Sequence, residues 1–277
     1  MRLICSLVFV CVGLPWFCHG VIQAQPPAPS SPAKSRGVVL ADLTWMEARE
    51  KLTPETVIVI ALGAEAKEHG PHLKLRNDWT MAEYFKRRIL QESDVVVAPT
   101  INYHFYPAFV EYPGSTTLRL ETARDLVVDI CASLAKHGPR RFYIINTGVS
   151  TLRALGPSAE MLAKQRILLK YTDILTVSGA TAKSLTQQKE GTHADEIETS
   201  KMLVIDPSSV DMSKATRDYP TGQGPLTPDK SRPGRYSPSG IYGDATLATR
   251  AKGEKVVEAT AQGMLREIEQ LRRSPLP

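Results

Sequence analysis

The chain has 277 residues, of which 42% are hydrophobic, and it carries a formal net charge of +5 with a pI near 9.0. This apolar content excludes a wholly disordered chain, and the length suits one large α/β domain. The basic balance does not indicate a nucleic-acid-binding protein, because the arginine pairs are scattered and no aromatic-rich basic patch accompanies them.

The first 24 residues are predicted to be a signal peptide. Arg2 precedes an apolar run over residues 3–18, and Ala24 offers a small residue at which a signal peptidase can cut. An uncleaved membrane anchor is the alternative, but the run is shorter than the roughly 20 residues of a spanning helix and Pro15 interrupts it. We therefore expect a periplasmic or extracellular protein with no stable membrane insertion after cleavage.

Residues 25–37 are rich in Pro and Ser and are predicted to form an extended tether, ahead of a single domain over residues 38–277. Three of the four cysteines lie in the predicted signal peptide. The mature chain would keep only Cys131, which cannot form an internal disulfide. The domain must therefore be stabilised by its core.

Short β-branched runs alternate with longer amphipathic segments along the domain. Strands are predicted at residues 56–62, 94–100, 141–147 and 167–175, and helices within residues 78–93, 122–138 and 247–273. This alternation predicts an α/β fold in which helices flank a mostly parallel sheet. Residues 216–240 form a long Pro/Gly-rich loop, a candidate cover for a cleft, because loops of this length are usually functional or disordered.

The stretch GAEAKEHGPHLKLRND follows the first strong strand and is the first candidate site. It lies at the strand's carboxyl end, the edge at which open α/β sheets bind ligands. Its Gly-Pro pair excludes a regular helix, so His69 and His72 do not share one helical face. Asp78 begins the next helix, where it can also serve simply as an N-cap. The stretch is either a metal or catalytic site or only a charged loop.

The stretch GTHADEIETSKML is the second candidate site. The spacing of Thr192 and Asp195 predicts a capping box, with His193 at the first helical position and Glu198 one and a half turns later. About 140° separates those two side chains on an ideal helix, so they share a site only if His193 reaches back from the helix start. Alternatively, Glu198 is solvated and pairs with Lys201.

Five segments occur in one order that resembles the creatininase family of metal-dependent hydrolases. They are the two stretches above, FVEYPGSTTLRLET, NTGVST and SGIYGDATLATRAKGEK, and the resemblance runs from about Leu40 to Gln270. It implies a creatininase-like three-layer α/β sandwich with its site at the strand carboxyl ends, often with two divalent cations. It also implies hydrolysis of a non-peptide or cyclic amide C–N bond, and assembly into a homo-oligomer.

Four residues match positions to which the family gives a role. His69 falls on a ligand histidine and Asp78 on the bridging aspartate, while His193 and Glu198 fall on a pair associated with substrate and catalysis. The resemblance therefore predicts His69 and Asp78 as metal ligands.

Three further positions depart from the family pattern. Lys67 replaces a ligand glutamate, Gly148 replaces a ligand histidine, and Ser150 stands where creatininase itself has a further acidic ligand. A charged ammonium has no lone pair for a metal, so we expect one divalent ion, zinc or manganese, or none. Alternatively, Lys67 itself supplies the positive charge by pairing with Asp78.

A third metal ligand is expected from nearby residues, with Glu68 as the first candidate and Glu198 among the others. His72, His104 and Glu111 are the remaining candidates and are predicted to bind substrate.

The leading hypothesis is a secreted amidohydrolase acting on a small-molecule amide. The predicted catalytic residues are Glu198 as base, His193 as donor to the leaving nitrogen, and Lys67 or a metal ion as stabiliser of the oxyanion. The alternative is a non-catalytic small-molecule-binding protein that retains the fold, since fold does not guarantee function.

Overall fold

The computed structural model describes residues 35–277. The predicted signal peptide and most of the predicted tether lie outside the described residues, so those predictions stay untested. At the start of the described part, the Gly37 N–H donates to the Leu90 carbonyl oxygen at 2.9 Å, directly before the first strand. Within residues 35–277, no helix combines the length and apolarity that crossing a membrane requires.

A sheet of five parallel strands lies at the centre, and four of them correspond to the strands that the sequence predicts. The strands are β1 (Val38–Val39), β2 (Val57–Leu62), β3 (Val96–Ile101), β4 (Arg141–Asn146) and β5 (Leu168–Tyr171). Their order is β1-β3-β2-β4-β5, so β2 lies in the middle and pairs with both β3 and β4. Its run VIVIAL is apolar throughout because both faces of a parallel sheet are covered.

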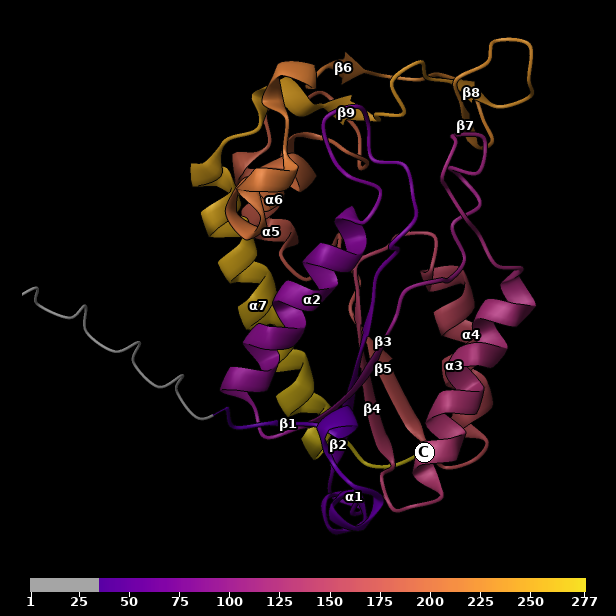
Figure 1. Cartoon of the computed structure of the whole chain (residues 1–277), viewed down its shortest axis with the longest axis vertical. Helices are drawn as coiled ribbons and strands as arrows, with labels where there is room; N and C mark the ends of the chain where they lie inside the picture. The colour runs from indigo at the N-terminus through magenta and orange to yellow at the C-terminus, as the bar shows by residue number, and fades with distance from the viewer. Residues whose placement is uncertain (1–34) are drawn as a thin grey trace, which may run out of the picture. The chain divides into compact units, whose positions relative to one another are not determined.

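Helices cover both faces of the sheet and complete three layers (Figure 1). The chain forms α1 (Trp45–Lys51), α2 (Asn77–Glu92), α3 (Leu120–Ala135), α4 (Leu152–Ala163), α5 (Gly179–Leu185), α6 (Glu196–Ile205) and α7 (Arg250–Arg273). Helices α2, α6 and α7 pack on one face, and α3 and α4 pack on the other. The fold class is therefore the predicted one.

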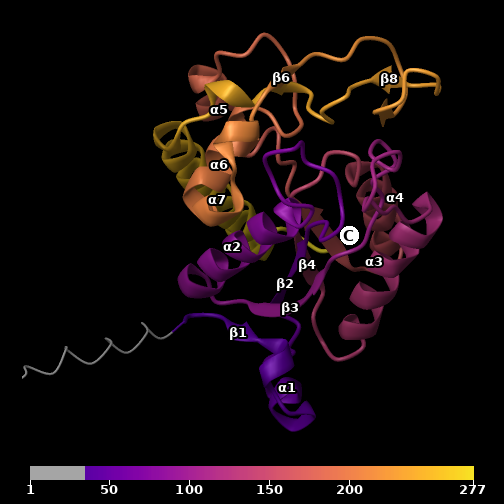
Figure 2. The same cartoon turned by 45° about the horizontal axis from the view of Figure 1, so that its top comes forward.

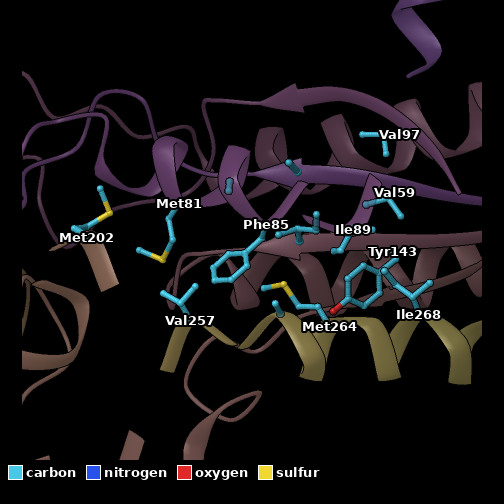
Figure 3. Packing of buried hydrophobic residues seen from close by; sticks show 14 of the residues in the cluster. Val59, Met81, Phe85, Ile89, Val97, Tyr143, Met202, Val257, Met264 and Ile268 are labelled. Atoms are coloured by element: carbon cyan, nitrogen blue, oxygen red, sulfur yellow. The ribbon is translucent and has the colours of Figure 1, made fainter. Parts of the chain in front are cut away.

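The core between the sheet and α2 and α7 is made of large apolar side chains. Figure 3 shows Phe85 and Ile89 of α2 facing Met264 and Ile268 of α7, with Val59 of the sheet next to Ile89. Phe85 is fully buried. Truncating such a side chain to alanine costs about 3–5 kcal/mol, so this layer holds α2, and the site residues at its start, in place.

The predicted start of α6 is wrong. The helix begins at Glu196, and its N-cap is Asp195, whose carboxylate accepts a hydrogen bond from the Glu198 N–H at 2.9 Å. His193 instead forms an isolated β-bridge with Tyr242, and Ala194 has φ +48°, a backbone conformation that no helix start adopts. His193 is therefore free of the helix, which removes the expected angular separation from Glu198.

The long loop over residues 216–240 is held by short strand pairs. Strands β6 (Arg217–Asp218) and β9 (Gly243–Asp244) pair antiparallel, and β7 (Leu226–Thr227) and β8 (Arg235–Tyr236) pair parallel. Figure 1 shows β6, β8 and β9 at the end of the sheet opposite α1, and Figure 2 turns that end forward. Because α1 leads into β2, this is the carboxyl end of the strands.

Candidate active site

The candidate site is assembled from loops at the carboxyl ends of three neighbouring strands. Lys67 follows β2, Phe109 follows β3 and Thr147 follows β4, while His193 lies just before α6 and Glu198 lies in its first turn. All five line one cavity of about 340 Å³. Leu226 and Arg235 of the covering loop close part of its wall.

Lys67 and Asp78 form a buried ion pair beside the cavity. The Lys67 Nζ lies 2.6 Å from Asp78 Oδ2, and the two side chains are almost completely withdrawn from solvent. Burial alone would raise the pKa of Asp78, but the charge of Lys67, followed by that of His69, outweighs it and holds the pKa well below its usual range. Asp78 is therefore ionised. Its carboxylate pairs across the site and caps no helix, because α2 begins at Asn77.

His69 lies between two acceptors. Its Nδ1 is 2.9 Å from the Lys67 carbonyl oxygen and its Nε2 is 2.9 Å from Asp78 Oδ1. The ring satisfies both oxygens only when both nitrogens carry a proton, or when a metal ion replaces the proton on Nε2. A proton or a metal ion on His69 Nε2 would therefore satisfy the neighbouring Asp78 carboxylate.

Glu198 is fixed by two hydrogen bonds. Its Oε1 accepts from Asn77 Nδ2 at 3.1 Å, and its Oε2 accepts from the Ala194 N–H at 2.7 Å. Burial would raise its pKa, but the neighbouring positive charges, that of His69 first, lower it. The side chain is 12% exposed, so an ionised, oriented carboxylate faces the cavity.

His193 is oriented by Glu68 and covered by Phe109. Its Nε2 donates to Glu68 Oε2 at 3.0 Å, which leaves Nδ1 facing Glu198 Oε2 at 3.9 Å. The Phe109 ring packs on the imidazole with centroids 4.0 Å apart, and Lys67 Nζ lies 4.8 Å from the same ring. This aromatic cover keeps bulk water away from one side of the charged groups.

The donors of His69, His193 and Glu198 fit one divalent ion. One ligand atom from each lies within 4.8 Å of the others. The separations of Glu198 oxygens from His69 Nε2 and His193 Nδ1 are 3.7 and 3.9 Å. Ligand atoms around tetrahedral zinc lie about 3.4 Å apart, given bonds of about 2.1 Å, so a small closure would complete the geometry. Of the three predicted ligands, His69 belongs to this group, whereas Asp78 Oδ2 pairs with Lys67 and Glu68 Oε2 pairs with His193. The predicted ligand set stays a prediction.

A second ion finds no comparable donor set in the described part of the chain. A Cβ added at Gly148 would lie 3.0 Å from Thr151 Cγ2 and 3.2 Å from the Tyr106 ring. Ser150 donates its hydroxyl to the Phe105 carbonyl oxygen at 3.0 Å. The space beside Gly148 is filled by Tyr106 and Thr151.

Three residues predicted to bind substrate do not line this cavity. His72 bonds Thr199 Oγ1 at 2.8 Å, and burial first of all lowers its pKa to about 4. His104 is fully buried and bonds the Ala123 carbonyl oxygen at 3.1 Å. Glu111 pairs with Arg232. Each is engaged elsewhere, so the structure does not bring these side chains into the site.

The sequence assigns no site role to four residues that the structure places here. Asn77 orients Glu198, and Phe109 covers His193, while Lys201 and Arg235 line the cavity. Asn77 stands at a predicted helix start, where polar residues are common, and Phe109 carries no polar signal. The capping of α6 by Asp195 would have placed Lys201 one turn after Glu198 on the same helix face.

The fold and the site together define a three-layer α/β protein with a histidine- and carboxylate-lined cavity at the strand carboxyl ends. The family described as "Creatininase: Creatinine amidohydrolase" matches residues 41–268. The chain belongs to the creatininase family.

Three relatives are similar over most of the chain, and the names of all three describe hydrolytic enzymes. The chain is 24% identical over 249 residues to the creatinine amidohydrolase of Pseudomonas putida, which covers 83% of this chain and 95% of the relative. It is 25% identical over 215 residues to a mycofactocin precursor peptide peptidase of Mycolicibacterium smegmatis, with 75% and 82% covered. It is 24% identical over 254 residues to a 3-dehydro-scyllo-inosose hydrolase of Thermotoga maritima, with 80% of each covered.

Solved structures of creatininases share the fold. A crystal structure of creatinine amidohydrolase superposes with a TM-score of 0.73 at 23% identity, covering 87% of this chain and all of the other. A structure described as "Creatininase Mn" gives 0.72 at 22% identity, covering 86% of this chain and all of the other. A mutant described as "Zn-Zn type" gives 0.68 at 23% identity, covering 87% and all of the other. At this identity the likeness shows the architecture.

Proposed function

We propose that this protein is a hydrolase that cleaves an amide C–N bond in a small molecule. Its family membership and the hydrolytic names of its relatives support a hydrolase. The observation that carries the proposal is the convergence of His69, His193 and Glu198 beside the Lys67–Asp78 pair. Lys67, His193 and Glu198 line a cavity of about 340 Å³. A cavity of this size suits a small molecule.

The chain's own groups can supply acid–base chemistry. Glu198, oriented by Asn77 and the Ala194 N–H, accepts a proton from a water molecule as the water oxygen bonds to the amide carbon. His193, oriented by Glu68, returns a proton from Nδ1 to the nitrogen as the C–N bond breaks. The proton taken from water is thereby matched by the proton given to the leaving amine.

Lys67 is suited to stabilise the oxyanion that develops on the carbonyl oxygen. Its ammonium lines the cavity, is only 4% exposed at the residue level, and is anchored by Asp78 and by the faces of Phe109 and Tyr106. A fixed positive charge in such a dry site is worth much more than in water. Asp78 holds Lys67 in position.

A divalent ion would be held by His69, His193 and Glu198, with zinc or manganese as the suitable metals. Bound there, it would polarise the carbonyl and acidify water, and the three side chains would act as ligands. His193 and Glu198 cannot serve as ligands and as acid and base at the same time. The effect of a chelator therefore decides which version applies.

The test is a screen of cyclic amides and ureides for hydrolysis, with creatinine among them, before and after removal of divalent ions. We expect hydrolysis of at least one compound and its loss in Glu198→Gln. Activity that survives chelation would show that Glu198 and His193 act as base and acid. Activity that is lost on chelation and restored by zinc or manganese would show that the three side chains hold a metal ion. Tight binding without turnover under every condition would show that the protein is a non-catalytic binding protein and not a hydrolase.

Export and assembly are further parts of the proposal. Residues 1–24 support export through a signal peptide, and N-terminal sequencing of the secreted protein tests it, with Gln25 the expected first residue. A homo-oligomer agrees with the exposure of Trp45, at 72%, and of Met46 on α1. Light scattering of the purified protein tests assembly, and a monomer at micromolar concentration would contradict it.

A further inference from the structure

Lys201 is a buried lysine without a protein partner. It lies in the middle of α6, its exposed fraction is 7%, and it lines the cavity of the candidate active site. Its ammonium makes no hydrogen bond and no ion pair with any residue of the described part, 35–277. The side chain is largely buried, but the ammonium opens onto the cavity, where it is available to a partner that is not part of the chain.

The nearby carboxylates form no ion pair with Lys201, because their oxygens accept hydrogen bonds from other donors. Glu198, one helical turn earlier, accepts from Asn77 and from the Ala194 N–H. Asp195 accepts from the Glu198 N–H at 2.9 Å and from Gln188 Nε2 at 2.6 Å. An i,i+3 pair of Glu and Lys commonly joins on a helix, but here both oxygens of Glu198 already have donors.

A second cation lines the same cavity. Arg235 comes from the covering loop, and its guanidinium carbon lies 5.0 Å from the centre of the Tyr242 ring. Its Nε is buried and has no hydrogen-bond acceptor within the described residues. Two cations from different elements therefore face one cavity without a carboxylate of their own, whereas Lys67 is paired with Asp78.

We infer that the cavity binds small amides that carry a negatively charged group, and that Lys201 is the residue that recognises this group. Residues three apart on a helix have Cβ atoms about 5–6 Å from each other. The anionic group would thus lie about one helical turn from Glu198, only a few bonds from the amide that is cleaved. The amide part of this inference rests on the proposed function, but the preference for a negative charge does not.

The probes are two pairs of compounds that differ only in a carboxylate. One pair is 5-oxoproline and 2-pyrrolidinone, and the other is dihydroorotate and dihydrouracil. Calorimetry should show that the protein binds at least one carboxylate at least tenfold more tightly than its neutral counterpart. Lys201→Met should remove that difference. Lys183→Met, which deletes the same charge from an exposed position on α5, should leave the difference unchanged.

Thermal unfolding provides a second readout. If Lys201 is a ligand-binding residue, Lys201→Met removes a charge that has no ion-pair partner, so the midpoint should stay or rise, and the carboxylate should raise it only in the wild-type protein. No preference for either carboxylate, or a preference that survives in Lys201→Met, would overturn the inference. Hydrolysis is measured separately. Carboxylate binding without turnover of either compound would count against the proposed hydrolysis and leave the charge preference standing.

Discussion

Lys67 Nζ lies 2.6 Å from Asp78 Oδ2, and neither side chain has an appreciable contact with solvent. A lysine thus stands where the family resemblance leads one to expect a metal-binding carboxylate. Its charge compensates a buried aspartate that also bonds His69. The pair links the loop after β2 to the start of α2, so its loss should lower the stability of the protein and displace side chains of the site.

Lys67→Met should therefore destabilise the protein strongly. It leaves Asp78 as a buried charge compensated only by His69, and breaking such a pair costs about 3–5 kcal/mol. The double variant Lys67→Met/Asp78→Asn removes both charges and should recover most of that loss. Chemical denaturation followed by circular dichroism measures both. Equal stability of the wild-type protein and Lys67→Met would show that the ion pair contributes little.

Acid should destabilise the protein through His104. Burial lowers the pKa of this histidine from 6.5 to about 4, and its bond to the Ala123 carbonyl oxygen offsets only part of that effect. A histidine whose folded pKa is depressed is neutral in the folded state and takes up a proton on unfolding. Its contribution is fully present above pH 6.5 and is lost as the pH falls toward 4, at about 1.4 kcal/mol per pH unit.

The measurement is the free energy of unfolding between pH 7 and pH 4 in His104→Gln and in a control, His137→Gln, whose side chain is exposed. His104→Gln should flatten the pH dependence over this window, and the control should not. An identical slope in the wild-type protein and His104→Gln would contradict the assignment.

Catalysis should depend on the groups at the centre of the site. His69→Ala and Glu198→Gln should each reduce turnover by at least about a hundredfold, the scale of a lost acid–base or electrostatic group. Asp78→Asn should do the same by releasing Lys67. Glu111→Gln is the matched control, because Glu111 pairs with Arg232 outside the cavity and should leave turnover within about twofold. Full activity in all three site variants would place the chemistry elsewhere.

The central strand and its parallel sheet could be predicted from the sequence, because burial on both faces leaves a clear pattern. The run VIVIAL in β2 has no polar residue, and its alternate side chains enter two separate cores. The start of α6 was not readable in the same way. Thr192 and Asp195 both suit an N-cap, and the choice depends on the bridge between His193 and Tyr242, which are far apart in the sequence.

The sequence could predict a feature of the site only where the type of one residue determines what its side chain can do. Lys67 cannot be a metal ligand while its ammonium is charged, and the structure confirms that it pairs with Asp78. His104 follows a strand, as a site residue does, but its ring turns into the core toward Ala123. Such an orientation depends on packing between distant segments, which spacing along the chain does not encode.

Metal stoichiometry tests how the site departs from a two-ion centre. We expect at most one divalent ion per chain, held by His69, His193 and Glu198. Restoring ligand types with Lys67→Glu, Gly148→His and Ser150→Glu should not be enough for a second ion. The new Cβ at position 148 would lie 3.0 Å from Thr151 and 3.2 Å from the Tyr106 ring, closer than ordinary contacts.

Adding Tyr106→Ala to those three changes should open the space and bring the metal content toward two ions per chain. Elemental analysis after exhaustive dialysis measures the content, and circular dichroism checks that each variant is folded. Tyr106→Ala alone is the control and should stay at one ion or fewer, because it adds no ligand. Two ions bound by the wild-type protein would refute the replacement of a metal by Lys67. If the triple variant bound two ions without Tyr106→Ala, Tyr106 and Thr151 would have to move aside at little cost. The charge of Lys67 and the missing ligands, and not the lack of space, would then exclude the second ion from the wild-type protein.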